Sequence, residues 1–198
     1  MDKELTQRIL RIYTAIDDLD ELNFENLEPW IIRTSEHNII RQDFRGSLSG
    51  QQIANLAHSC IANIASLKDH LRSWAAHNGQ SKEEVDDTLD NSLDLQIITD
   101  LWNREKHGHP RDAGLTGESP QLVGIKRVLR MTTGSNTGDS IALTLGPDGR
   151  PRVMGSGSAV VVITGDVIDG NGTMIGDLRR IATDAMAAWE GLMKEFGI

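Results

Sequence analysis

Apolar residues recur every three or four positions in four long stretches of the chain, the spacing that gives an α-helix one apolar face. The predicted helices span residues 2–22, 50–77, 82–107 and 173–198. Ser49 and Ser81 each stand three positions before a Gln or Glu, which is the capping-box pattern of a helix start. The third helix is expected to be interrupted near Ser92, and Gly108 followed by Pro110 predicts its end.

The period of the pattern changes to two after Pro110, which is typical of strands. The predicted strands span residues 123–132, 141–145, 153–154 and 159–163. A Gly-Pro-Asp-Gly turn at 146–149 joins two of them. Residues 23–47 contain only short apolar runs, which predict a packed connection with one short helix or strand.

The chain is therefore predicted to be a mainly α member of the α+β class. We expect a four-helix bundle with a small antiparallel β-sheet, of three or four strands, inserted before the last helix. The length of 198 residues is compatible with a single domain, 1–198. Its helical part covers residues 1–110, the β-insertion covers 111–172, and the last helix, 173–198, returns to the bundle because its apolar face needs a partner.

The composition predicts the compartment in which the protein acts. No apolar run approaches the length of about 20 residues that spans a bilayer, and the acidic, polar start of the chain lacks a signal-peptide pattern. The single cysteine, Cys60, excludes an internal disulfide and is expected to be a small buried residue. These features predict a cytoplasmic protein without a membrane partner.

The formal net charge of −9 argues against non-specific binding of nucleic acid through bulk electrostatics. The charge is uneven, however, because residues 104–152 carry 8 basic and 5 acidic side chains, a local net charge of +3. An anionic ligand is therefore most compatible with this segment.

The third predicted helix carries a row of polar side chains opposite its apolar face. Gln96, Asp100, Asn103 and His107 follow one another at spacings of four, three and four, so they lie on one stripe. Together with Lys106, the residues Asp100 and Asn103 are the candidate binding residues. The structural alternative is a solvated helix end with cations near the negative pole of the helix dipole.

Arg104 and His107 are the candidate catalytic residues. They are three positions apart, so their side chains can meet on the helix surface. A histidine exchanges protons near neutral pH and an arginine holds a phosphate, so the pair has the chemistry of a metal-independent RNA-cleaving site. No metal and no cofactor are predicted. His107, His109 and Asp112 could share a metal only if the loop folds back, and no second cluster with metal-ligand spacing is evident.

Residues 166–175 have some features of a calcium loop. Asp169, Asn171 and Gly172 match its third, fifth and sixth positions, but the first and twelfth positions are Val167 and Leu178. The segment is therefore predicted to be a Gly-Asn-Gly turn that leads into the last helix.

The pattern Asp100, Asn103, Lys106 and His107 at the end of a helix resembles the HEPN superfamily, and in particular small members with an Asp-x-x-Asn-x-x-Lys-His signature. The resemblance covers the helices and not the sheet. It implies a helical bundle. Many HEPN proteins are metal-independent RNases, often toxins, that dimerise to form their cleft, whereas others bind nucleotides or protein partners without catalysis.

The RNase members have four to six residues between Arg and His, whereas Arg104 and His107 have two between them. The sequence therefore favours a non-catalytic binding module for a nucleotide, a nucleic acid or a partner protein, with the ligand near residues 100–112. The alternative is a toxin-like, metal-independent endoribonuclease that uses His107 and Arg104.

A homodimer is expected for two reasons. Many HEPN proteins dimerise, and the third helix is apolar over a wide arc, because Leu89, Leu93 and Ile97 lie well away from Leu95, Ile98 and Trp102. In the monomeric alternative, the first and last helices cover this arc. The tryptophans on or beside the apolar faces of three helices are expected to be largely buried. They are Trp74, Trp102 and Trp189.

Overall fold

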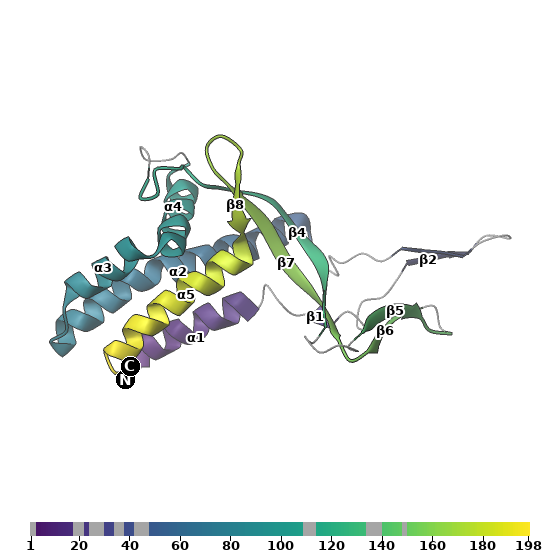
Figure 1. The fold of residues 1–198 in the computed structure, drawn as a ribbon, viewed down its shortest axis with the longest axis horizontal. Helices are drawn as coiled ribbons and strands as arrows, with labels where there is room; N and C mark the ends of the chain where they lie inside the picture. Colours follow the sequence, from purple (N-terminus) through teal and green to yellow (C-terminus); the bar gives the residue numbers. More distant parts are fainter. Residues whose placement is uncertain are drawn as a thin grey trace. The chain divides into compact units, whose positions relative to one another are not determined.

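The computed structural model describes residues 3–17, 22–23, 30–33, 38–41, 48–108, 114–133, 140–147 and 150–198 (Figure 1). Five helices and eight strands lie in this part of the chain, which confirms the mixed α+β class. No helix in the described ranges is both long enough and apolar enough to cross a membrane.

The chain divides into two compact units. The first, here called the helical unit, combines Met1–Leu19, Ala54–Ile125 and Thr164–Ile198. The second, the sheet unit, combines Asp20–Ile53 and Lys126–Ile163. This division differs from the predicted parts, because residues before the second helix belong to the sheet unit and both ends of the predicted β-insertion belong to the helical unit.

The helices begin and end largely where the local patterns predict. They are α1 (Lys3–Asp17), α2 (Gly50–Asn78), α3 (Lys82–Asn91), α4 (Leu93–His107) and α5 (Leu178–Glu195). The capping box before α2 is confirmed, because the backbone N–H of Gln52 donates to Ser49 Oγ at 3.2 Å and that of Ser49 donates to Gln52 Oε1 at 2.8 Å. Ser81 caps α3 by accepting from the N–H of Glu83 at 3.0 Å.

The predicted interruption near Ser92 is also confirmed. This residue ends α3, because its N–H donates to the Leu89 carbonyl at 3.2 Å, and it begins α4, because its hydroxyl accepts from the N–H of Leu95 at 3.3 Å. Gly108 ends α4 in the left-handed conformation, with φ of 71°. One serine therefore separates two helices that the sequence pattern nearly merges.

Two helix boundaries were predicted wrongly. Leu22 is not helical but lies in a short strand, in which it pairs with Val161. The last helix begins at Leu178 rather than near residue 173, because the Asp177 carboxylate accepts from the N–H of Arg179 at 2.9 Å and of Arg180 at 3.2 Å. This side chain satisfies the free N–H groups of the first turn and so sets the start of α5.

The strands form three separate sheets instead of the single small sheet that was predicted. They are β1 (Leu22–Asn23), β2 (Trp30–Arg33), β3 (Asn38–Arg41), β4 (Gln121–Thr132), β5 (Ile141–Leu145), β6 (Pro151–Gly155), β7 (Ser158–Ile168) and β8 (Met174–Asp177). The largest sheet has the order β1-β7-β4, and β8 also pairs with β7. Antiparallel hairpins β2–β3 and β5–β6 form the other two, so the segment 23–47 contains a strand pair where one short element was expected.

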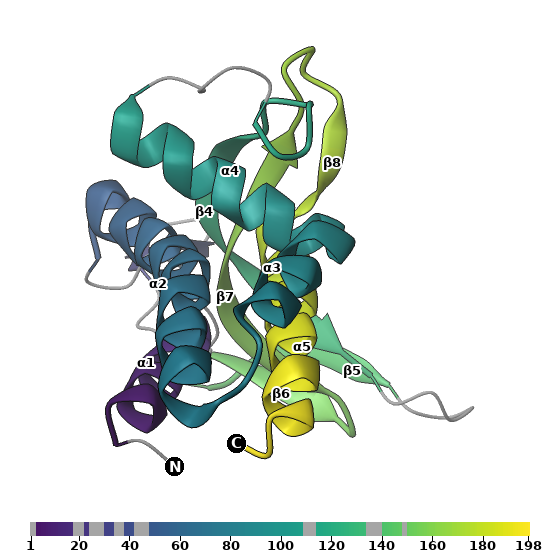
Figure 2. The same ribbon diagram turned by 90° about the vertical axis from the view of Figure 1, so that its left-hand side faces the viewer.

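The core of the helical unit is built by α5 and the helices packed on it (Figure 2). Trp189 is 1% exposed, as predicted, and α4 contributes the fully buried Leu95 and Ile98. Trp74 and Trp102 are only half-buried, so the expectation that they are largely buried was wrong for these two. Trp74 stacks on Phe196, with ring centroids 5.7 Å apart.

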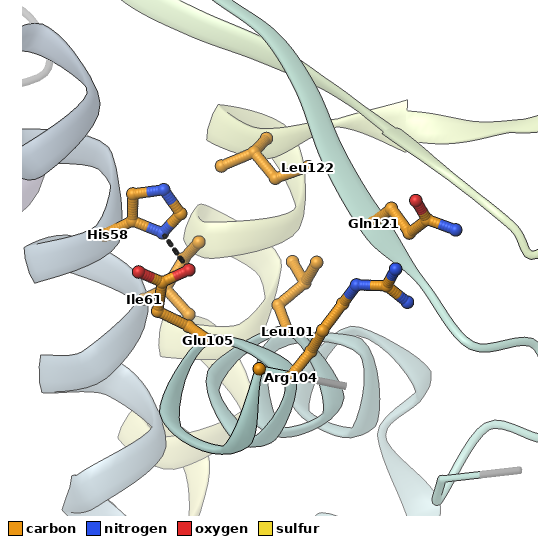
Figure 3. A pocket seen from close by; sticks show the side chains of 8 residues that line it. His58, Ile61, Leu101, Arg104, Glu105, Gln121 and Leu122 are labelled. Atoms are coloured by element: carbon orange, nitrogen blue, oxygen red, sulfur yellow. Dashed lines mark ion pairs between the residues drawn. The ribbon is translucent and has the colours of Figure 1, made fainter. Parts of the chain in front are cut away.

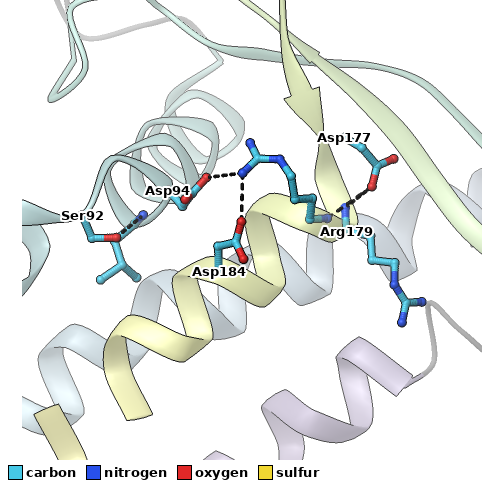
Figure 4. A network of polar contacts seen from close by, with 7 residues as sticks. Ser92, Asp94, Asp177, Arg179 and Asp184 are labelled. Atoms are coloured by element: carbon cyan, nitrogen blue, oxygen red, sulfur yellow. Dashed lines mark hydrogen bonds and ion pairs between the residues drawn. The ribbon is translucent and has the colours of Figure 1, made fainter. Parts of the chain in front are cut away.

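Polar contacts join the starts of α4 and α5 (Figure 4). The Arg180 guanidinium donates to Asp94 at 3.4 Å and to Asp184 at 2.9 Å. Burial raises the pKa of Asp94, and this effect outweighs the neighbouring Arg180, which lowers it. Asp177 additionally accepts a hydrogen bond from the Thr164 hydroxyl. These contacts hold the first turns of α4 and α5 together.

Candidate functional site

Gln96, the first residue of the polar stripe, hydrogen-bonds to the backbone of the preceding helix. Gln96 Nε2 donates to the carbonyl oxygen of Asp90 at 2.6 Å and to that of Leu89 at 3.3 Å. Both acceptors lie in the last turn of α3, where helix carbonyls lack intrahelical partners. The Gln96 amide therefore supports the α3–α4 junction.

Asp100, the second member, is 6% exposed and binds the loop that follows α4. Its Oδ1 accepts from the N–H of Leu115 at 2.8 Å, and its Oδ2 accepts from the N–H and the hydroxyl of Thr116 at 2.9 and 2.8 Å. Gly114 has a φ of 66°, and a Cβ built on it would lie 2.6 Å from Asp100 Oδ2. Asp100 therefore holds the loop. Its spacing predicted an open row with Asn103 and His107, and this prediction was wrong for Asp100.

The remaining predicted residues lie around the last turns of α4. Asn103 and His107 are half-buried and Lys106 is exposed. None of the three lines the pocket described next. His109 and Asp112, the other members of the conceivable metal cluster, lie outside the described residues. Among the described residues, no group of three or more His, Cys, Asp or Glu side chains is arranged to hold a metal.

A pocket of about 220 Å³ lies beside the end of α4 (Figure 3). Its walls come from α2, from the last turns of α4 and from the start of β4, all within the helical unit. The lining residues are His58, Ile61, Leu101, Arg104, Glu105, Gly108, Gln121 and Leu122. Three of these residues are apolar and form one part of the wall, while the polar groups come from all three elements.

Arg104 is the cationic group of this pocket. The residue is half-buried, and its side chain extends toward Gln121 (Figure 3). Its carbonyl accepts from the N–H of Gly108 at 2.8 Å, but its guanidinium has no hydrogen-bond or ion-pair partner within the described ranges. A half-buried guanidinium has five donors in a planar fork, so this one has its donors available to a ligand.

His58 and Glu105 face each other on the other side of the pocket (Figure 3). His58 Nδ1 lies 3.6 Å from Glu105 Oε2, and the two side chains are 32% and 53% exposed. The distance is that of an ion pair when the imidazole is protonated, and it exceeds that of a direct hydrogen bond. A carboxylate in this place orients the imidazole ring.

Two other features have structural roles. The turn at 169–173 is built as predicted, because Asp169 Oδ1 accepts from the N–H groups of Asn171 and Thr173 at 2.8 and 2.7 Å. These backbone hydrogen bonds lower the pKa of Asp169. Cys60 is fully buried, and burial raises the pKa of its thiol to about 12, so the thiol stays protonated and unreactive.

The pattern of the sequence therefore identified Arg104 but missed His58, Glu105 and Gln121 as its neighbours. His58 lies on α2 one turn before Ile61, in a helix that the sequence assigned to the core alone. Gln121 is the first residue of β4. Comparisons with protein-family models, with curated proteins and with solved structures found no match to this chain.

Proposed function

We propose that this chain is a HEPN-like binding module that takes the phosphate of a nucleotide or nucleic acid in the pocket beside Arg104. The observation that carries the proposal is the half-buried guanidinium, which lines a pocket and has no partner among the described residues. Arginine donates two parallel hydrogen bonds to a phosphate, and such charge-assisted bonds are among the strongest in proteins. Gln121 supplies an amide on the same side of the pocket.

The size of the pocket limits what it encloses. Sites that enclose a drug-sized ligand have volumes of roughly 300–1,000 Å³. A pocket of about 220 Å³ therefore holds one phosphate with part of its sugar, and the remainder of the ligand lies outside. The carboxyl end of α4 has partial negative charge, so the helix itself does not attract the anion. Arg104 must supply most of the binding free energy.

The assignment to a HEPN-like bundle rests on the pattern Asp100, Asn103, Lys106 and His107 at the end of α4. Gly108 ends this helix directly after the pattern, which supports the comparison. The burial of Asp100 suits a non-catalytic protein, because the carboxylate is used by the loop at 114–116. In this proposal the residues of the pattern hold the loop and the end of the helix, while Arg104 binds the phosphate.

The proposal is tested by calorimetric titration with inorganic phosphate, with adenosine monophosphate and with a short single-stranded RNA. We expect the substitution Arg104→Gln to weaken binding by at least about tenfold, the effect of losing roughly 1.4 kcal/mol. Lys106→Gln is the matched control, because it removes the same charge from the same turn at an exposed position outside the pocket. Equal affinities of the wild type and Arg104→Gln would contradict the proposal.

The alternative function, a metal-independent endoribonuclease, is supported by the neighbourhood of His58, Glu105 and Arg104. In this alternative His58 takes the proton of a ribose 2′-hydroxyl as its oxygen attacks the adjacent phosphorus. The P–O5′ bond breaks, which leaves a 2′,3′-cyclic phosphate, and the departing 5′-oxygen takes a proton from water. Arg104 stabilises the charge that develops on the phosphate. The imidazole closest to Arg104 in the sequence, His107, does not line the pocket. The histidine of this reaction is thus His58 in place of His107.

Incubation of a labelled RNA with the protein and excess chelator distinguishes the two functions. Cleavage that persists in the wild type, is abolished by His58→Ala and survives in His107→Ala would establish the alternative. The absence of cleavage in a sample that binds RNA would establish the binding module. Slowed growth on expression, relieved by His58→Ala, is the corresponding observation in cells.

A further inference from the structure

The hairpin of β5 and β6 has an outer edge on each of its two strands. These strands pair with each other and with no other strand in the described part of the chain (Figure 1). In a strand, the backbone N–H and C=O groups of successive residues point alternately to the two sides, and groups on an unpaired edge are a template for a further strand. The register of the hairpin shows which residues of β5 point outward.

Backbone hydrogen bonds at the two ends of the hairpin fix this direction. The N–H of Gly146 donates to the Arg150 carbonyl at 2.8 Å, and that of Ser156 donates to the Ser140 carbonyl at 3.1 Å. Opposite residues in an antiparallel pair alternate between hydrogen-bonded and non-hydrogen-bonded pairs. The even-numbered residues of 140–146 are therefore bonded toward β6, and the odd-numbered residues direct their N–H and C=O groups to the outer edge. The outward residues are Ile141, Leu143 and Leu145.

The outer edge of β5 lacks the protection that the edge of β6 has. Pro151 lies opposite Leu145 in a non-hydrogen-bonded pair, so its nitrogen, which carries no hydrogen, faces away from β5. Proline and charged side chains are the usual means by which a strand edge avoids pairing. β5, with the sequence Ile-Ala-Leu-Thr-Leu, has neither. Within the described ranges, its outward backbone groups have no hydrogen-bond partner.

The two faces of the hairpin differ in chemistry. One face carries the apolar side chains of the outward residues, and Leu143 and Leu145 are 43% and 59% exposed. On the other face β5 has only alanine and threonine, while Arg152 and Arg150 lie opposite on β6 and just before it. Neighbouring strands are about 4.8 Å apart, a distance that an arginine side chain can span. The sequence of residues 140–157 contains one acidic residue, Asp148, so this face is basic.

We propose that β5 pairs along its outer edge with an antiparallel, extended segment of another protein in which apolar and acidic residues alternate. The added strand forms backbone hydrogen bonds with the three outward residues, as in other cases of β-strand addition. Its side chains point alternately to the two faces, so its apolar residues contact Leu143 and Leu145 and its acidic residues lie on the face of Arg150 and Arg152. This surface belongs to the sheet unit and is independent of the pocket at Arg104.

A second copy of this chain is less complementary to the same edge. Two β5 strands that pair antiparallel about a two-fold axis keep equivalent faces on one side of the sheet. The arginines of both copies would then lie on the same face, and β5 itself supplies no acidic side chain to either of them. Like charges on one face disfavour pairing, whereas an acidic strand has the opposite charge.

The probe for this surface is a seven-residue peptide of alternating valine and glutamate, titrated into the whole protein by calorimetry. We expect it to bind the wild type, and the same peptide with lysine in place of glutamate to bind at least about tenfold more weakly. Leu143→Thr, which keeps a residue that favours strands, should weaken binding by about fivefold. Met154→Thr is the matched control, because Met154 is also exposed but lies on β6, and it should bind like the wild type.

The backbone pairing is tested without any change to the protein. In the antiparallel pairing the valine nitrogens of the peptide face β5, so methylation of these nitrogens should abolish binding, whereas methylation of the glutamate nitrogens should not. Hydrogen exchange followed by NMR should show that the peptide slows exchange at the three outward amides of β5 and not at Ala142 and Thr144, which already donate to β6.

Three outcomes would overturn the proposal. The first is that the valine–glutamate peptide does not bind the wild type. The second is that both methylated peptides bind equally well, or that protection from exchange does not alternate along β5. The third is that the wild type self-associates through β5 and Leu143→Thr prevents it, because the occupant of the edge would then be a second copy of this chain.

Discussion

The two ends of α4 use polar side chains in opposite ways. At its start and middle, Ser92, Gln96 and Asp100 bind backbone groups of the chain itself. At its end, Arg104 lines a pocket and Lys106 is exposed, and neither side chain has a hydrogen-bond or ion-pair partner in the described part of the chain. Polar side chains on one helix therefore differ in whether they bind the chain itself, and the difference depends on whether an unsatisfied backbone group lies within reach.

The largest effect that tests this comparison is expected at Asp100. Asp100→Ala removes a buried carboxylate and leaves the N–H groups of Leu115 and Thr116 without their acceptor, so we expect it to lower the free energy of unfolding by about 3 kcal/mol. Thr116→Val removes one of the three hydrogen bonds to Asp100 and the acceptor of the Glu118 N–H, so it should cost about 1–2 kcal/mol. Urea unfolding measures both, and a loss below that of Thr116→Val would contradict the structural role of Asp100.

A smaller loss is expected at the start of the helix. Ser92→Ala removes the hydroxyl that accepts from the N–H of Leu95, and it should lower the free energy of unfolding by about 1 kcal/mol. Ser81→Ala, at the start of α3, is a matched control for the loss of an N-cap hydroxyl. Chemical unfolding of the two variants should give similar midpoints, and an unchanged Ser92→Ala would show that the first turn of α4 does not depend on its cap.

The end of the helix should tolerate change. Arg104→Gln removes no hydrogen bond of the described structure, so its free energy of unfolding should stay within about 0.5 kcal/mol of the wild type. Phosphate added in excess should stabilise the wild type and not the variant, because a ligand stabilises only the state that binds it. Thermal unfolding with and without phosphate is the measurement. A strongly destabilised Arg104→Gln would remove the distinction between the two ends.

The smallest effect concerns Asp94. Its pKa is raised in the folded state, chiefly by burial, so the folded protein holds the proton more tightly than the unfolded chain does. The favourable contribution of this group is therefore present in acid and lost as the pH rises through the folded pKa. Asp94→Asn should be more stable than the wild type at about pH 7, by up to roughly 0.5 kcal/mol, with a smaller difference at about pH 4. Urea unfolding at both pH values decides this, and a destabilised variant at neutral pH would mean that the Arg180 contact dominates.

Local patterns predicted much of the helical fold. The caps at Ser49, Ser81 and Ser92 depend on side chains that bind backbone N–H groups two or three residues away, so spacing alone identifies them. The stop at Gly108 depends on a residue type that adopts the left-handed conformation, and its backbone N–H binds the Arg104 carbonyl. Leu22 was assigned to a helix because its strand depends on pairing with Val161, which lies far along the chain. Short strands have no strong local signature, and their existence depends on a distant partner.

The pocket, too, could be predicted only where it depends on local spacing. Arg104 could be chosen from the sequence because it lies three residues from His107 near the end of a helix. Its neighbours His58 and Gln121 belong to α2 and β4, and only the packing of these elements brings them to one place. The periodicity also could not distinguish Asp100 from His107, since both lie on one stripe and only the packing of the chain brings the loop at 114–116 onto Asp100.

The composition of the helical unit from three separate segments has a consequence for biosynthesis. α5 contributes eight buried side chains, among them Trp189, and its first residues are encoded long after those of α2. We therefore expect the apolar faces of α2 and α4 to stay exposed on the ribosome until α5 has emerged. Covering them requires contacts between residues that are far apart in the sequence, which form slowly. In a pulse-proteolysis experiment on stalled nascent chains, protection of the helical unit should appear abruptly once α5 leaves the exit tunnel.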